Sequence, residues 1–286
     1  MISAHDETYL RCLAKAYAGK EQPTRAILRS TGEKIGARTT FGEQFIYPMS
    51  QGFPLLTTKR MSFQTIREEL LWFLRGETNV RSLQAKGVHI WDEWADSEGN
   101  LGPIYGAMWR RWGEHPGGGP VDQIAQLIQG IVATRDDPTA SVGRRLIVTA
   151  WDPSRIPETK LPPCHCFFQC HVADGCLDLL LYQRSADVFL GVPYNVASYA
   201  MLLAGLAHCT GLLPGRFIHS VGNLHLYSNH LLQAEEQLQR RGRTSPLIRL
   251  PAEQVSCSPE GLLNVIEGMT LMFYNAEGPL RGEVAV

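Results

Sequence analysis

The chain has 286 residues, 44% of them hydrophobic, which is enough for one large core or two small ones. Its formal net charge is −1 and its pI is about 6.8, which excludes a globally basic surface for nucleic acid or anionic membranes. Seven cysteines, an odd number in a long chain, predict reduced thiols in a cytoplasmic protein rather than a disulfide framework.

The first clear element is a helix predicted over residues 62–77, SFQTIREELLWFLRGE, with Ser62 as its N-cap. Its apolar side chains recur at helical spacing on one face, at Phe63, Ile66, Leu70, Phe73 and Leu74. Glu69 lies beside this face, whereas Glu68 is predicted to point well away from it. The glycine-rich loop at 113–120 joins apolar segments, so we interpret it as a surface excursion within one domain.

The second half of the chain is predicted to contain strands and two helices. Residues 144–151 have the composition of a strand, and 166–172 and 176–185 are predicted to form a hairpin turned by Asp174-Gly175. Polar residues interrupt the apolar helix expected at 193–213, which favours the core over a membrane. A strand at 216–227 and a helix at 228–242, ended by Gly242, follow. This mixture predicts an α+β fold, in which helices cover a large mixed or antiparallel sheet, as a single domain over 1–286.

The stretch LPPCHCFFQC, residues 161–170, holds three cysteines. On a strand, alternation places Cys164, Cys166 and Cys170 on one face and His165 on the other. Same-face neighbours are then about 6.6 Å apart. Sulfurs around a tetrahedral zinc lie within roughly 4 Å of one another, so the spacing argues against a metal site, and a disulfide would be strained.

One reactive thiol is the remaining functional interpretation, and Cys164 is the best candidate. Pro162 and Pro163 fix the backbone just before it, so we expect it at a loop-to-strand boundary. A reactive thiolate needs nearby positive charge, which Arg184 on the partner strand of the hairpin can supply. Cys166, Cys170 and Cys176 are interpreted as small core residues, since free cysteine is commonly buried.

Longer motifs carry a resemblance to a known family. In chain order they are GFPLLTTKR, EELLWFLRGETN, IWDEWAD, LGPIYG, GRRLIVTAW, PCH, LYQRSADVFLGVPYNVASY, HLYSNH and the terminal VAV. Together they closely resemble thymidylate synthases. The resemblance implies an enzyme that forms a homodimer through its sheet. It would methylate C5 of dUMP with 5,10-methylenetetrahydrofolate as carbon donor and reductant, without a metal.

The resemblance also assigns nucleotide-binding residues. Cys164 matches the nucleophile that adds to C6 of the pyrimidine, a case of covalent catalysis, and Arg184 matches an arginine that supports the thiolate and contacts the phosphate. Asn195 matches the residue that recognises the pyrimidine edge. The matched nucleotide-binding residues are Lys34, Arg38, Arg144, Arg145, Gln183, Arg184, Ser185, Asn195, His225 and Tyr227. Of these, Arg144 and Arg145 match a pair that reaches the partner's site, and His225 and Tyr227 match residues that bind the ribose 3′-hydroxyl.

Further matches concern proton transfer and folate. Glu69 matches a glutamate that organises water and proton transfers, Tyr105 a tyrosine implicated in removing the C5 proton, and His165 another site residue. The matched folate-site residues are Trp91, Trp94, Asp187, Gly191 and Val286, of which Asp187 matches an aspartate that bonds the pterin. Val286 matches the terminal residue that closes over the complex and excludes water.

The sequence departs from the family pattern at the phosphate loop and beside the site. Lys34 stands where an arginine is expected, and a lysine lacks the bidentate fork, so we expect Arg38 to compensate. Asn223 replaces a common aspartate and Ala186 a larger residue. These changes leave open the exact base and sugar, and the alternative of a folate-dependent 5-hydroxymethylase acting on dUMP, dCMP or CMP. A non-catalytic nucleotide- or RNA-binding relative is disfavoured because Cys164, Tyr105 and Glu69 are all present.

Overall fold

A computed structural model describes residues 3–113, 119–253 and 255–285. Its helices are α1 (Ala4–Tyr17), α2 (Phe63–Leu74), α3 (Arg81–Gln84), α4 (Tyr105–Arg110), α5 (Gln123–Asp136), α6 (Gly191–Cys209), α7 (Leu231–Gln239) and α8 (Pro259–Gly268). Its strands are β1 (Lys20–Ile27), β2 (Lys34–Pro48), β3 (Ile147–Thr149), β4 (His165–Ala173), β5 (Cys176–Asp187), β6 (Leu213–Tyr227), β7 (Leu247–Arg249) and β8 (Thr270–Met272).

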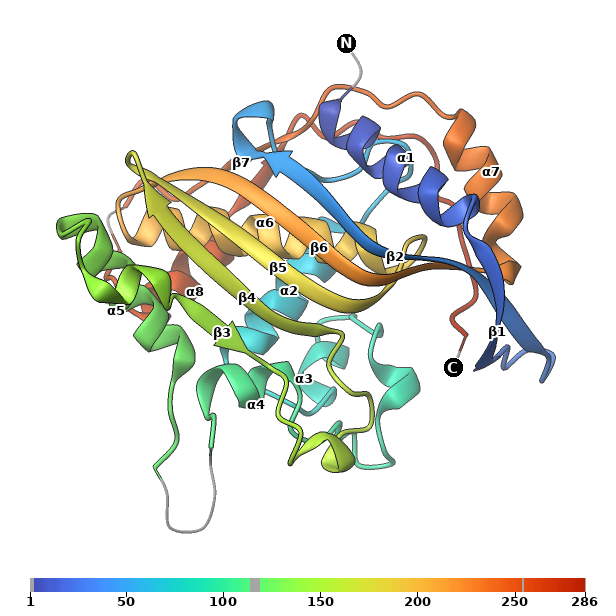
Figure 1. Cartoon of the computed structure of the whole chain (residues 1–286), viewed down its shortest axis with the longest axis horizontal. Helices are drawn as coiled ribbons and strands as arrows, with labels where there is room; N and C mark the ends of the chain where they lie inside the picture. The colour runs from blue at the N-terminus through green and yellow to red at the C-terminus, as the bar shows by residue number, and fades with distance from the viewer. Residues whose placement is uncertain (1–2, 114–118, 254, 286) are drawn as a thin grey trace.

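Six strands form one mixed sheet in the order β1-β2-β6-β5-β4-β3, as Figure 1 shows. Its neighbours pair antiparallel except β5 and β6, which run parallel because α6 connects them as a crossover. The β4–β5 turn is the predicted one: Asp174 and Gly175 both have positive φ, 50° and 72°, as a two-residue hairpin turn requires. The α+β prediction is confirmed.

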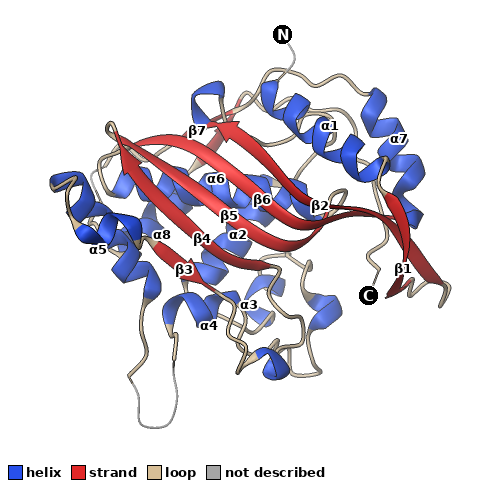
Figure 2. Cartoon of the chain, viewed as in Figure 1, coloured by secondary structure: helices blue, strands red, loops and turns tan. Residues whose placement is uncertain are grey.

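The helices gather on one face of the sheet and leave the other face open (Figures 1 and 2). The core forms where α6 packs on β5 and β6, and the rings of Tyr47, Phe217 and Tyr199 stack in series from β2 through β6 to α6. The alternate side chains face away from the helices, and there Ile46 and Ile147 are 42% and 46% exposed. Within the described ranges, no helix is long and apolar enough to cross a membrane.

Several predicted boundaries were wrong; the helix predicted over 62–77, for example, ends at Leu74 as α2. The strand predicted at 144–151 shortens to β3, because residues 141–144 form a 3-10 turn and three residues pair with β4. The helix predicted at 228–242 ends at Gln239, before Gly242, because Arg240 has an extended backbone and its guanidinium donates to the carbonyls of Thr58 and Gly278. The helix predicted at 193–213 begins and ends earlier, as α6. Most of the loop predicted at 113–120 lies outside the described residues.

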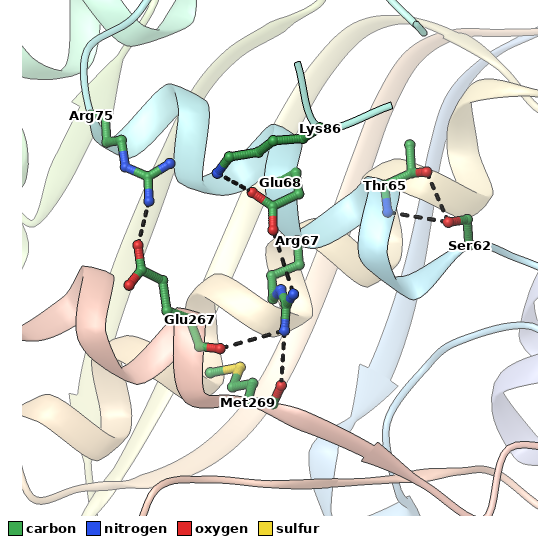
Figure 3. Close-up of polar contacts among 8 residues, drawn as sticks. All are labelled: Ser62, Thr65, Arg67, Glu68, Arg75, Lys86, Glu267 and Met269. Atoms are coloured by element: carbon green, nitrogen blue, oxygen red, sulfur yellow. Dashed lines mark hydrogen bonds and ion pairs between the residues drawn. The ribbon is translucent and has the colours of Figure 1, made fainter. Parts of the chain in front are cut away.

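Helix α2 is fixed along its outer side, as Figure 3 shows. The Ser62 hydroxyl accepts from the Thr65 N–H at 3.2 Å, which confirms the predicted N-cap. Glu68, which is predicted to point away from the apolar face, is nevertheless buried, and its carboxylate pairs with Lys86 at 2.5 Å and Arg67 at 3.4 Å. A buried carboxylate needs such partners, so the outer side of α2 is packed as well as its apolar face.

Candidate active site

The Cys164 thiol lies at the start of β4, where the chain leaves the Pro162-Pro163 segment. The Arg184 guanidinium lies 3.7 Å from its Sγ and donates to the carbonyls of Pro162 at 2.7 Å and Pro163 at 2.9 Å. One arginine therefore fixes the loop and places positive charge beside the sulfur. Burial raises the pKa of the Cys164 thiol, and the charge of Arg184 opposes that rise. In this state the thiol is mostly protonated at neutral pH, so its activation requires a proton transfer.

A β-bulge at the start of β4 overturns the predicted alternation of side chains. His165 pairs with Gln183 and Phe167 with Tyr182, which leaves Cys166 as the extra residue. His165 therefore points toward α6, as Phe168 does: their rings lie 5.2 Å and 5.7 Å from that of Tyr199. Burial lowers the pKa of His165 to about 4, and a hydrogen bond with Asn195 opposes the decrease, so the imidazole is neutral at pH 7.

The remaining cysteines are split between core and surface. Cys166 and Cys170 are buried, as the core interpretation predicts, whereas Cys176 is half-buried beside the β4–β5 turn. All seven thiols are free. Only Cys164 combines partial exposure with an adjacent guanidinium among the cysteines of β4 and its entry.

The Tyr105 hydroxyl lies beside the nucleophile candidate. It accepts hydrogen bonds from the backbone N–H of Cys164 at 2.8 Å and of His165 at 3.4 Å, so its own proton is free to donate elsewhere. Its ring packs 4.8 Å from Phe73 and 5.0 Å from His165. Burial keeps its pKa well above the ordinary value, so Tyr105 remains a phenol at neutral pH.

Glu69 forms a buried pair with Trp91. The indole N–H of Trp91 donates to Glu69 Oε1 at 2.8 Å, and burial raises the pKa of Glu69 to about 7 although this bond opposes the rise. A carboxyl with that pKa can both give and take a proton near neutral pH. Trp94, half-buried, packs edge-on to Trp91 with ring centroids 5.8 Å apart.

Asn195 and Gln183 meet between α6 and β5. The Gln183 amide donates to Asn195 Oδ1 at 3.1 Å and to the carbonyl of Ser185 at 3.0 Å. His219 on β6 lies at the far side of Gln183, with its Nε2 2.9 Å from Gln183 Oε1. These contacts hold the Asn195 amide in one orientation.

Asp187, His225 and Tyr227 meet where β5 and β6 end. Asp187 pairs with His225 in the sheet, and the rings of His225 and Tyr227 lie 4.9 Å apart on one strand face, as alternation predicts. Asp187 Oδ1 accepts from the N–H groups of Phe189 and Leu190, while its Oδ2 receives no hydrogen bond from the described chain. A free carboxylate oxygen at this position can accept from a ligand. Gly191 begins α6 directly afterwards, and a Cβ there would meet only ordinary contacts.

Within one chain, not all of the residues predicted to bind phosphate lie beside Cys164 and Arg184. Lys34 is exposed at the start of β2, and Arg38 donates to the Tyr17 carbonyl at 2.8 Å and stacks on the Tyr17 ring. The hydrogen bond to Tyr17 uses only Nη1 of Arg38, and the role of Arg38 in binding phosphate stays a prediction. Arg144 and Arg145 are exposed just before β3, at the edge of the sheet.

The comparison with protein families decides the class of this site. A family model described as thymidylate synthase matches residues 7–286, nearly the whole chain.

The chain belongs to the thymidylate synthase family.

Membership establishes, at the level of the family, folate-dependent methylation or hydroxymethylation of a pyrimidine. Asp187 Oδ2 is open to an N–H donor and the half-buried Trp94 packs on Trp91, so these residues would hold a folate if one binds here. In the described ranges, no three histidine, cysteine or acidic side chains are grouped to hold a metal.

Two charged residues near the site were not predicted from the sequence. Arg29, in the β1–β2 turn, pairs at 2.5 Å with Glu93, which stands between Trp91 and Trp94 in the sequence. Lys59 is 4% exposed; its ammonium donates to the carbonyl of Phe189 and lies 4.0 Å from the centre of the Phe189 ring. Burial lowers the pKa of Lys59 to about 7, with the Asp187 carboxylate opposing the decrease. Lys59 lies within the quoted motif GFPLLTTKR, but nothing local in that motif signals burial.

The C-terminal segment is seated against the β1–β2 turn. Ala285 forms a bridge with Leu28, and the Glu283 carboxylate accepts from the N–H of Ser30 at 2.9 Å and from its hydroxyl at 2.6 Å. The Glu283 carbonyl also lies 3.0 Å from His230 Nε2. Val286, predicted to close the site, lies outside the described residues.

Proposed function

We propose that this family member catalyses the reductive methylation of dUMP at C5, giving dTMP. The observation that carries the proposal is the Cys164 thiol held 3.7 Å from the Arg184 guanidinium. C5 of uracil is a weak nucleophile, and addition of the thiolate at C6 makes it enolate-like. The positive charge of Arg184 stabilises the thiolate as the thiol loses its proton. The cosubstrate 5,10-methylenetetrahydrofolate supplies the carbon and the reducing hydride.

Two neighbours of Cys164 suit the proton transfers that this reaction needs. Glu69, with a pKa of about 7, can exchange protons with the base and the folate at neutral pH. The Tyr105 hydroxyl already accepts from the Cys164 N–H, so its free proton side is available to water or a carboxylate near the C5 proton. Removal of that proton completes the exchange of hydrogen for carbon at C5.

The choice of uracil rests on the orientation of Asn195. A side-chain amide can accept from N3–H and donate to O4 of uracil at the same time. Gln183 donates to Asn195 Oδ1, which leaves the Asn195 NH₂ group directed away from Gln183 and free for O4.

Methylation rather than hydroxymethylation requires a site that excludes water until hydride arrives. Two features support this choice: Trp91 is buried over Glu69, and the C-terminal segment is already seated beside the site at Leu28 and Ser30. In a hydroxymethylase, the alternative, water would capture the same electrophilic carbon.

The decisive experiment identifies both products by mass after incubation with dUMP and 5,10-methylenetetrahydrofolate. We expect dTMP and dihydrofolate in equal amounts, and none from Cys164→Ser. Tetrahydrofolate with a 5-hydroxymethyl nucleotide would establish the alternative activity. Turnover of dCMP or CMP in preference to dUMP would show that the assignment of Asn195 is wrong.

We also infer that the open face of the sheet binds a second copy of the chain. This face carries the exposed Ile46 and Ile147 and the stacked rings of Phe167 and Tyr182, 5.5 Å apart. Such an apolar surface favours burial against a partner. In a dimer built on this face, Arg144 and Arg145 would leave their own subunit and complete the partner's phosphate site.

Mixing two inactive variants tests this shared site. Cys164→Ser and Arg144→Ala subunits, dissociated and reassociated together, should regain activity, because a mixed dimer has one site with both residues intact. A monomer in analytical ultracentrifugation, or a mixture without regained activity, would contradict the shared site. Reassociated wild-type protein is the control for recovery from dissociation.

A further inference from the structure

A row of buried polar side chains extends from the centre of the core to Asn195. His219 on β6 contacts Gln183 on β5 at 2.9 Å, and Gln183 contacts Asn195 on α6 at 3.1 Å. His219 is fully buried and Gln183 is 3% exposed. Three consecutive elements of the chain therefore meet through two hydrogen bonds, and the last residue of the row is the one expected to recognise the base.

The direction of each hydrogen bond in this row follows from one backbone carbonyl. The carbonyl of Ser185 can only accept, so the Gln183 nitrogen must face it, 3.0 Å away. The Gln183 oxygen then faces His219, and His219 Nε2 must carry the proton that it donates. The same Gln183 nitrogen donates to Asn195 Oδ1. All donors in the row thus point from His219 toward Asn195.

The surroundings of His219 keep its imidazole ring neutral, with a single N–H. Its ring stacks on Phe217 at 5.8 Å, and its Nδ1 is buried without a hydrogen-bond partner in the described chain. Burial, and next the neighbouring His165, lower the pKa of His219 to about 3, so it is neutral at pH 7. A neutral imidazole has one N–H, and the Gln183 oxygen requires it at Nε2.

We propose that His219 is a positioning residue for base specificity, which acts through Gln183 to set the orientation of the Asn195 amide. The proposal rests on the proposed function, in which Asn195 binds the uracil edge, and adds to it a residue that never touches the nucleotide.

Reversal of the row shows why its direction matters. If the Asn195 amide turned over, its NH₂ group would face Gln183, and the Gln183 amide would have to turn as well. His219 could then accept from the Gln183 nitrogen only by moving its proton to Nδ1, which is buried and has no acceptor in the described chain, and the Ser185 carbonyl would lose its donor. A reversed Asn195 presents a donor toward N3 and an acceptor toward position 4, which suits cytosine. His219 therefore stabilises the uracil-selecting orientation.

Replacement of His219 by leucine tests the proposal, since leucine has a similar volume and no donor. We expect the preference for dUMP over dCMP in equilibrium binding to fall roughly tenfold or more, as the loss of a buried hydrogen bond would produce. His219→Gln can still donate from its amide and should retain most of the preference. Phe217→Leu removes the ring that stacks on His219 but leaves every hydrogen bond of the row in place, so its preference should equal that of the wild type.

Measurements of turnover test the proposed function, and measurements of nucleotide binding test the role of His219. Failure of the wild type to form dTMP would reject the proposed function, while the ratio of binding constants would still test His219. An unchanged ratio in His219→Leu, or equal binding of both nucleotides by the wild type, would overturn the role of His219.

A second test uses the wild-type protein, so it does not depend on whether a variant folds. In protein labelled with ¹⁵N-histidine, the His219 signal is recognised by its proximity to Phe217 ring protons. It should show the Nε2–H tautomer, and an Nδ1–H tautomer would also overturn the proposal.

Discussion

Replacement of Trp91 by phenylalanine tests the link between Glu69 and the proposed folate site. The Trp91 indole N–H lies 2.8 Å from Glu69 Oε1, and it is the contact that opposes the burial-driven rise of the Glu69 pKa to about 7. A hydrogen bond to a charged group contributes roughly 1.5–3 kcal/mol, equivalent to about one to two pH units. Trp91→Phe keeps an aromatic ring and removes the donor. Glu69 should then lose its proton about one to two pH units higher than in the wild type.

The assay is kcat/KM for dTMP formation measured from roughly pH 5 to pH 10. Because the carboxylate is the form that takes up a proton, wild-type activity should rise as the pH passes about 7, and this limb should move upward in Trp91→Phe. Phe73→Leu is the control, since Phe73 packs edge-on to Trp91 with ring centroids 6.2 Å apart and makes no hydrogen bond to Glu69. A limb that stays in place in Trp91→Phe, or moves equally in Phe73→Leu, would refute the reasoning.

Four further outcomes are expected. Cys164→Ser should abolish turnover but retain nucleotide binding, and a 5-fluoro nucleotide with folate should label Cys164 in the wild type; labelling of another cysteine in mass spectrometry would contradict this. Arg38→Ala should raise the nucleotide KM roughly tenfold; an unchanged KM would mean that Arg38 stays at Tyr17 when nucleotide binds. Deletion of Val286 should slow dTMP formation more than it weakens nucleotide binding, and equal effects would argue against closure. The pKa of Glu69 is about 7 against an ordinary 4.5, so its contribution to stability is full below pH 4.5 and falls by roughly 3 kcal/mol as the pH rises through 7. Chemical unfolding of Glu69→Gln should lack this pH-dependent loss.

The elements that the sequence predicted well are those fixed by neighbouring residues. Asp174-Gly175 adopts the two positive φ angles of a hairpin turn, and Ser62 caps α2, because both depend on a few adjacent bonds. The two prolines before Cys164 likewise placed that thiol at a loop-to-strand boundary. Motif order then predicted the site residues across the whole chain, although their roles stay predictions until the experiments above are done.

The features that the sequence did not predict depend on residues distant in the chain. The bulge at Cys166 turns His165 toward α6, and it follows from pairing with β5, which no local spacing encodes. Glu68 is buried because Lys86 lies close enough to pair with its charge, and α7 ends early because Arg240 binds the carbonyls of Thr58 and Gly278.

By itself, the sequence determined the fold class and the family and predicted Cys164 as the reactive thiol, because turn chemistry, periodicity and motif order depend only on the order of residues in the chain. Only the tertiary structure decided which polar groups share a dry environment. Burial raises the pKa of Glu69, which is hydrogen-bonded to Trp91, to about 7. Packing of the sheet on α6 connects His219 through Gln183 to Asn195 by hydrogen bonds. These effects arise from desolvation and from contacts between β5, β6 and α6, and both exist only once the sheet and the helices have packed together.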